Sequence, residues 1–142
     1  MKITYNITIS GQPIPLKRHR YVYKRGHLIS YDPQKKQKED FAWKCRAEIS
    51  GNVKPIEGAF ILSGEFYVSR KAMKKEDEGT YRIERPDIDN YLKFLLDSLQ
   101  GSFFADDSHC VTIVGRKWHS KNARTELIIE ELSTLRRKTF NG

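Results

Sequence analysis

Two segments with helical periodicity, set among segments that alternate like β-strands, constrain the fold of this chain most strongly. The repeating apolar residues are Phe41, Cys45 and Ile49 in the first segment, and Ile88, Leu92, Leu95 and Leu99 in the second. Apolar residues three and four positions apart share one face of an α-helix, and a glycine just beyond the last turn ends it. Because Gly51 and Gly101 follow these segments, we expect helices over residues 32–50 and 86–100. The first opens with Asp32-Pro33, a pair typical of helix starts.

The other ordered segments have the two-residue alternation or the β-branched composition of strands. We expect strands over 3–9, 59–69, 111–118 and 125–132, and a hairpin over 20–30. Gly64 predicts a bulge within its strand. This order predicts an α+β fold, a mixed sheet of about five strands with two helices packed on one face. The length fits a single domain over 1–142, in which we expect 132–142 to be a flexible basic tail.

The composition favours a polyanionic partner and gives no sign of a membrane or a disulfide framework. The formal net charge is +8, an excess that favours nucleic acid among other polyanions. Cys45 and Cys110 have no metal-site spacing, which is typical of reduced thiols in a cytosolic protein. Residues 1–9 lack the apolar core of a signal peptide, and no apolar run reaches the length of a membrane span. We expect the charged segment 70–85 to be a mobile, exposed loop.

Four aspartates gather around the second helix of this basic chain: Asp87, Asp89, Asp106 and Asp107. Asp87 and Asp89 lie at the helix start, and Lys93 lies four residues after Asp89, on the same face and away from the apolar stripe. Carboxylates from separate segments can hold Mg²⁺ or Mn²⁺ with open positions for water and a phosphate. Such an ion activates water and neutralises charge in the transition state, and a nearby lysine stabilises the same charge.

Each of these residues also has a structural interpretation. Asp87 can be an N-cap, Asp89 a first-turn residue paired with Lys93, and the pair Asp106-Asp107 a solvated turn. The four histidines, at positions 19, 27, 109 and 119, form no cluster with ligand spacing. We expect Phe103 and Phe104 to anchor their loop in the core, and Asp97 to lie on the surface.

The segment RPDIDNYLKFLLDSL, followed by FFADDSHCV and by a strand ending in Lys117-Trp118, resembles the RusA family of Holliday-junction resolvases. The shared residues are Arg85, Asp87, Asp89, Asn90, Lys93 and the pair Asp106-Asp107. The proline-containing loop after the first strand and the basic, aromatic segment at Arg20 to Tyr23 are also similar. The resemblance covers most of the chain and is most specific over residues 85–107.

The resemblance implies a homodimeric, Mg²⁺-dependent endodeoxyribonuclease that makes paired nicks in four-way DNA junctions during recombination and repair. It implies that Asp87, Asp89 and Asp107 are catalytic metal ligands, with Asp106 as the alternative to Asp107, and that Lys93 is an essential lysine. A two-fold dimer would deliver two symmetric cuts to a nearly two-fold substrate. The residues expected to face DNA are Lys17, Arg18, Arg20, Lys24, Arg25, Lys74, Lys75, Arg82 and Arg85.

Two other functions stay open on the sequence. A non-catalytic module that binds branched DNA would bind without Mg²⁺ and would not nick it. A general flap or single-strand nuclease would cleave other DNA structures as well as four-way junctions. We expect a cytoplasmic protein of a bacterium or its prophage in any of these cases.

Overall fold

The computed structural model describes residues 2–133, and its elements follow the predicted order. The strands are β1 (Thr4–Ser10), β2 (Arg20–Lys24), β3 (His27–Tyr31), β4 (Phe60–Val68), β5 (Cys110–His119) and β6 (Arg124–Glu131). The α-helices are α1 (Lys35–Ala47) and α2 (Ile88–Leu99), and Lys75–Asp77 and Asp107–His109 form short 3₁₀ helices. No helix among residues 2–133 is both long enough and apolar enough to cross a membrane.

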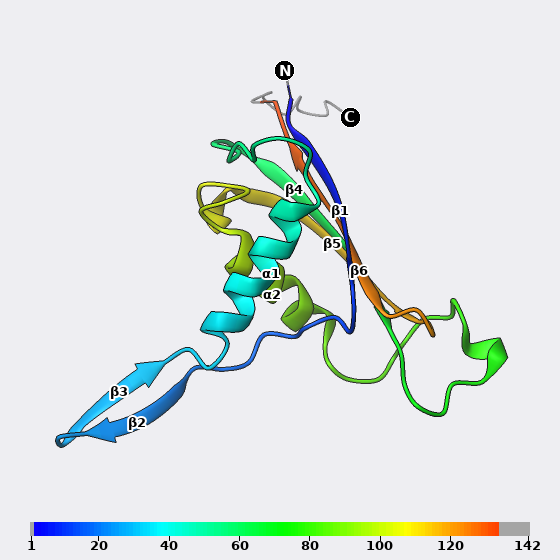
Figure 1. The fold of residues 1–142 in the computed structure, drawn as a ribbon, viewed down its shortest axis with the longest axis horizontal. Helices are drawn as coiled ribbons and strands as arrows, with labels where there is room; N and C mark the ends of the chain where they lie inside the picture. The colour runs from blue at the N-terminus through cyan, green and yellow to red at the C-terminus, as the bar shows by residue number, and fades with distance from the viewer. Residues whose placement is uncertain (1, 134–142) are drawn as a thin grey trace, which may run out of the picture.

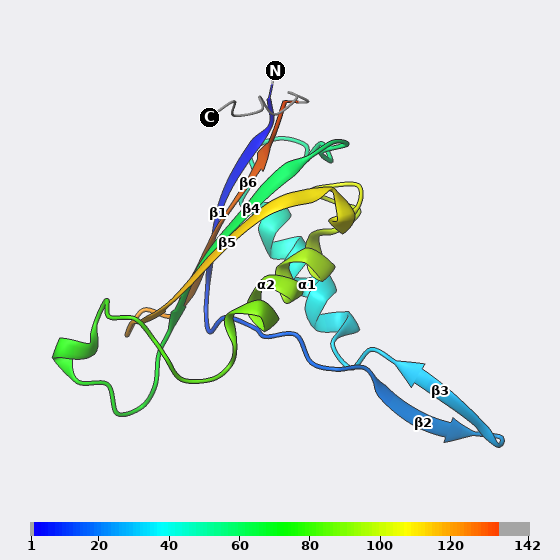
Figure 2. The ribbon, with the colours of Figure 1, turned by 180° about the vertical axis from the view of Figure 1, so that it is seen from behind.

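The main sheet has four strands in the order β1-β6-β4-β5, with β4 and β5 parallel and the other pairs antiparallel. Both helices lie on the same face of this sheet, and no other helix or strand of residues 2–133 covers the opposite face (Figures 1 and 2). The predicted α+β class and mixed sheet are therefore confirmed. The strands β2 and β3 do not join this sheet and instead form a separate two-stranded sheet.

Alternation along the central strand β4 determines how the helices pack. Every second residue of β4 is buried, beginning with Phe60. On the buried face Phe66 stacks on Tyr91 of α2, with ring centroids 4.9 Å apart. The rings of Phe60 and Phe104 stack at 4.4 Å, and Phe103 and Phe104 are both completely buried. The loop after α2 is thus anchored in the core, as the sequence predicted.

Two glycines permit close packing under α2. The predicted bulge at Gly64 is wrong, because the register irregularity in β4 falls between Phe60 and Ile61. A Cβ atom at Gly64 would lie 2.7 Å from Cζ of Phe66, so glycine makes room for that ring. A Cβ atom at Gly115 would lie 2.9 Å from Cδ1 of Leu92. Gly115 therefore lets the first half of α2 approach β5 closely.

Local structure differs from the prediction at the start of α1 and in the charged loop. The helix begins at Lys35, after Gln34 as N-cap, but the Asp32 carboxylate still accepts hydrogen bonds from the Gln34 amide and Lys38 Nζ. The segment 70–85 is largely exposed as expected, yet its second half is fixed to the end of β5. The amide of Gly79 donates to the His119 carbonyl, and Tyr81 stacks on Trp118.

The expected tail over 132–142 falls mostly outside the described residues. Its first residue, Leu132, still follows the sheet, because its amide donates to the Ala59 carbonyl at 2.9 Å.

Candidate active site and nucleic-acid interface

The N-terminus of α2 presents Asp87 and Asp89 to solvent. Asp87 occupies the N-cap position with an extended backbone, at φ −69° and ψ 147°. Its side chain makes no capping hydrogen bond, so the position fits the N-cap interpretation but the usual stabilising contact is missing. Asp89 follows in the first turn and is also exposed. Two carboxylates are thus available at the positive end of the helix dipole.

Lys93 lies one turn further along the same exposed side of α2. Its Nζ is 3.5 Å from Oδ2 of Asp89, and both side chains are about three-fifths exposed. Such an open ion pair contributes little to stability. The expected pairing is confirmed, and the lysine remains accessible to an anion that approaches the two carboxylates.

Two cationic side chains, Lys117 and Arg82, hold the backbone of residues 84–86, the segment that leads into Asp87. Lys117 Nζ, at the end of β5, donates to the carbonyls of Glu84 and Pro86, both at 2.8 Å. Arg82 Nη2 donates to the intervening Arg85 carbonyl at 2.7 Å. Three consecutive carbonyls before Asp87 are therefore hydrogen-bonded to charged donors, a strong class of hydrogen bond. We infer that these bonds fix the position of the Asp87 backbone.

This role changes the interpretation of Arg82, which was expected to face DNA. Its side chain is only 11% exposed and is directed toward the loop backbone. The sequence itself identifies Lys117 only as a residue at the end of a strand. The sequence does show a lysine near the end of a strand rich in β-branched residues. It does not show which backbone carbonyls that lysine contacts.

Asp107 lies at the opposite end of α2. Its amide donates to Oε1 of Gln100, the residue that follows the last turn of the helix. The twelve residues of α2 span about 18 Å at the usual rise per residue. Among residues 2–133, no three His, Cys, Asp or Glu side chains are arranged to hold a metal ion. One chain therefore brings together Asp87, Asp89 and Lys93, but not Asp107.

Asp106 and Asp107 have different environments in their turn. The Asp106 carboxylate accepts the Ser108 amide at 2.9 Å, and this hydrogen bond is the main cause of a lowered pKa for Asp106. Partial desolvation, followed by the neighbouring Asp106, raises the pKa of Asp107. Asp106 thus stabilises its own turn, and Asp107 is the less firmly bonded carboxylate of the pair.

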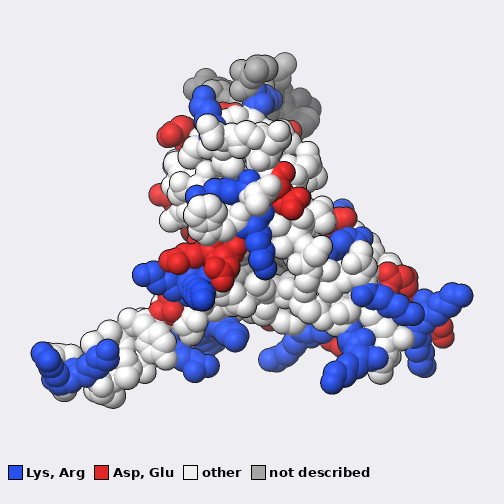
Figure 3. All heavy atoms as spheres, viewed as in Figure 1, with Lys and Arg blue, Asp and Glu red and all other residues white. Residues whose placement is uncertain are grey.

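Two projections flank the N-terminus of α2 (Figures 1 and 2). One is the β2–β3 hairpin, and the other is the loop over residues 69–86, here called the 69–86 loop. The amide of Leu16, shortly before the hairpin, donates to the Asn90 carbonyl of α2 at 2.8 Å. Lys and Arg side chains line the lower edge of the molecule from the hairpin tip to this loop (Figure 3).

Most residues expected to face DNA lie on these projections or just before the hairpin, and all of these are exposed: Lys17, Arg18, Arg20, Lys24, Arg25, Lys74, Lys75 and Arg85. Arg82 is the exception. Cations on both sides of exposed carboxylates form a surface to which a phosphate backbone can bind.

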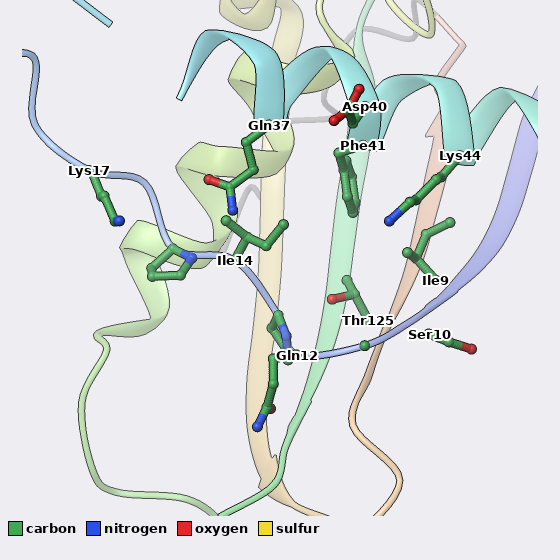
Figure 4. Close-up of a pocket in the computed structure, with 13 residues that line it drawn as sticks. Ile9, Ser10, Gln12, Ile14, Lys17, Gln37, Asp40, Phe41, Lys44 and Thr125 are labelled. Atoms are coloured by element: carbon green, nitrogen blue, oxygen red, sulfur yellow. The ribbon is translucent and has the colours of Figure 1, made fainter. Parts of the chain in front are cut away.

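A hollow near this surface does not contain the candidate carboxylates. A cavity of about 550 Å³ lies between α1 and the segment after β1, with Asp40, Phe41 and Lys44 on its helical side (Figure 4). None of Asp87, Asp89 and Asp107 lines it. The candidate site is therefore an open surface, which suits a polymer better than a small enclosed ligand.

Comparison with known proteins supports a nucleic-acid interface at this surface. The model of the family described as "Endodeoxyribonuclease RusA" matches residues 10–130. The chain is also similar to "Uncharacterized protein YqaN" of Bacillus subtilis (strain 168), with 28% identity over 138 residues. That alignment covers 89% of this chain and 95% of the relative. The family match includes the hairpin, α2 and the loop that carries Asp107.

Proposed function

Because this chain belongs to the RusA endodeoxyribonuclease family, we propose that it resolves four-way DNA junctions by paired nicks in recombination and repair. The observation that carries this proposal is the placement of Asp87 and Asp89, exposed and beside Lys93, between two cationic projections. A pure binding module gains nothing from carboxylates directed at phosphates. We also propose a cytoplasmic location, where bacterial DNA is recombined.

We propose Mg²⁺, with Mn²⁺ as a substitute, as the cofactor at Asp87 and Asp89. Two carboxylates with water and substrate phosphate are a donor set that suits Mg²⁺. When bound, such an ion activates a water and neutralises the charge that develops on the phosphate. Lys93, whose side chain is exposed one turn away, then stabilises the same developing charge.

A ligand role for Asp107 requires a second copy of the chain. Within one protomer Asp107 is separated from Asp87 and Asp89 by the length of α2. The cap residues that flank α2, Asp87 and Gln100, are exposed, as are Lys93 and Asp97 between them. If two copies of α2 lie antiparallel across a two-fold axis, Asp107 of the partner subunit comes next to Asp87 and Asp89, and symmetry repeats the arrangement. The proposed homodimer would therefore complete two centres.

The separation of Asp107 within one chain is the observation that favours the alternative, a non-catalytic module that binds branched DNA. A labelled four-way junction, incubated with and without Mg²⁺, distinguishes the two. We expect Mg²⁺-dependent symmetric nicks from the unmodified protein. Linear duplex and three-way DNA, in parallel, would reveal a less selective nuclease.

The variant for this experiment is Asp89→Asn. It should abolish cleavage and keep or tighten junction binding, because it removes a charge that repels phosphate. Asp40→Asn is the matched control, since Asp40 is an exposed aspartate of α1 and lies outside the proposed contact between copies of α2. Loss of binding together with cleavage in Asp89→Asn, or binding without nicking by the unmodified protein, would contradict the proposal.

A further inference from the structure

The β2–β3 hairpin extends from the body of the molecule and exposes every residue of both its strands (Figures 1 and 2). An isolated two-stranded hairpin is at best marginally stable in water. Large apolar side chains are nevertheless among the exposed ones, and clustered exposed apolar groups mark interaction surfaces. We propose that this hairpin enters the branch point of the DNA, where Tyr21 and Tyr23 stack on bases that have lost a stacking neighbour. The proposal rests on the proposed function as a junction nuclease.

Strand register gathers the aromatic side chains on one face. Tyr21 lies opposite Ser30, and Tyr23 lies opposite Leu28. Residues directly opposite each other in an antiparallel pair share a face, as do residues two apart along a strand. The relative exposures of Tyr21, Tyr23 and Leu28 are 65%, 75% and 56%. This face therefore presents two tyrosine rings and a leucine to the surroundings, without support from the core.

Charge selects nucleic acid over a second copy of the chain as the occupant. Residues 11–31 contain no Asp or Glu, and their five Lys and Arg residues are Lys17, Arg18, Arg20, Lys24 and Arg25. A phosphate backbone complements these five cations, whereas the same hairpin of a second copy would only add like charges. Aromatic rings beside cations are the usual platform for unpaired bases, because each base offers a π-face and a nearby phosphate. Bases inside a continuous duplex have both faces covered, so a branch point is the fitting partner.

The root of the hairpin is fixed beside the candidate site. The buried side chain of Gln34, which follows β3, accepts the Lys17 amide at 2.6 Å and donates to the Pro15 carbonyl at 2.9 Å. One glutamine thus joins the two ends of the hairpin. The adjacent Leu16 amide bonds to Asn90 of α2. Bases held by the hairpin would therefore belong to the DNA whose backbone lies at Asp87 and Asp89.

The test uses four-way junctions with 5-iodouracil at the branch point, because photocrosslinking of this base favours stacked aromatic side chains. All variants carry Asp89→Asn to prevent cleavage. We expect crosslinks at Tyr21 or Tyr23, retained in Tyr21→Phe/Tyr23→Phe and lost in Tyr21→Ala/Tyr23→Ala. Because stacking contributes about 1–3 kcal/mol per base, the alanine pair should raise the junction Kd about tenfold or more and leave the duplex Kd within about twofold.

Trp43→Ala is the matched control, since Trp43 is 66% exposed on α1 outside the hairpin. It should keep the junction Kd of the Asp89→Asn parent. Thermal unfolding checks that the alanine pair is folded. The proposal is overturned if that pair binds junctions as tightly as the parent, or if it is monomeric where the parent is dimeric, which would assign the hairpin to a partner subunit. Crosslinking and binding need no cleavage. If the Asp89→Asn parent crosslinks at these tyrosines but the unmodified protein never nicks DNA, only the nuclease proposal is refuted.

Discussion

Lys117 illustrates how one side chain can connect the sheet to the candidate chemistry. Lys117→Met removes the donor to the Glu84 and Pro86 carbonyls, and hydrogen bonds from charged donors contribute about 1.5–3 kcal/mol each. We expect cleavage at saturating junction to fall at least about tenfold, because a small displacement at a reacting group is costly. The junction Kd, measured without divalent cation, should change little.

A general loss of folding would give a different result. Lys117→Arg should restore part of the cleavage rate, and Lys121→Met should behave like the parent, because Lys121 is an exposed lysine of the next turn. Equal losses of binding and cleavage in Lys117→Met would refute a positioning role.

Asp32 stabilises the start of α1 only when it is ionised. Its hydrogen bond with Lys38, at 2.6 Å, is the main cause of a pKa below the ordinary value of 3.8. A depressed pKa gives stability that is fully present above the unfolded value and is lost as pH falls through the folded one. We expect Asp32→Asn to lower the free energy of unfolding by about 1 kcal/mol at pH 7.

The pH dependence of the free energy of unfolding distinguishes the loss of the Asp32 charge from a steric effect of the asparagine side chain. In urea titrations the difference between Asp32→Asn and the parent should persist at pH 5 and shrink below about pH 4. A difference that is unchanged at the lowest pH at which the protein folds would show that the charge is not responsible.

At the scale of elements, the approach of α2 to β5 depends on Gly115. A methyl group there would meet Leu92 at 2.9 Å and Ile88 at 3.0 Å. Overpacking of a core usually costs about 1–3 kcal/mol. We expect Gly115→Ala to displace the first turns of α2, and with them Asp87 and Asp89. The cleavage rate should then fall even at temperatures at which the melting curve shows that the variant is fully folded. Rate and melting curves of Gly58→Ala, where a Cβ meets nothing within 4 Å, provide the comparison.

Elements with strong local signals could be predicted from the sequence. The stripe through Leu92, Leu95 and Leu99 identified α2, and the spacing of Asp89 and Lys93 identified their ion pair, because both depend only on helical geometry. The separation of β2 and β3 from the main sheet could not be predicted. Local alternation shows that a strand forms, but the neighbour with which it pairs depends on contacts far away in sequence.

The position of Asp107 was equally inaccessible to sequence reasoning. The sequence places Asp87, Asp89 and Asp107 around one helix and the loop after it, and that loop is short. A short loop, however, keeps its residues near the end of the helix, and the Gln100 side chain holds the Asp107 amide there. The distance across α2 then separates residues that the sequence motif groups together.

At the scale of the whole molecule, mixed dimers can test whether the proposed centres are shared between subunits. Asp89→Asn and Asp107→Asn should each be inactive alone. In a mixed dimer, one centre would combine the intact Asp89 of one subunit with the intact Asp107 of its partner, and the other centre would carry both substitutions. We therefore expect mixing after co-refolding to restore single nicks in a four-way junction without full resolution.

A site contained in one chain predicts the opposite result. Each centre of the mixed dimer would then lack one carboxylate, and no nicking would return. Sedimentation of the mixture must show dimers, so that absent activity can be assigned to the arrangement of the site and not to failed assembly.

The hairpin that extends from the fold also separates two kinds of evolutionary constraint. Because its strand residues are exposed along their whole length, substitutions there leave the hydrophobic core intact and change stability little. Selection on that segment can then follow the DNA alone, while the helices and the main sheet are selected for folding and for catalysis. A chain built in this way can acquire a new DNA preference by exchanging residues of this hairpin, Arg20 to Tyr31, and keep the rest of its scaffold.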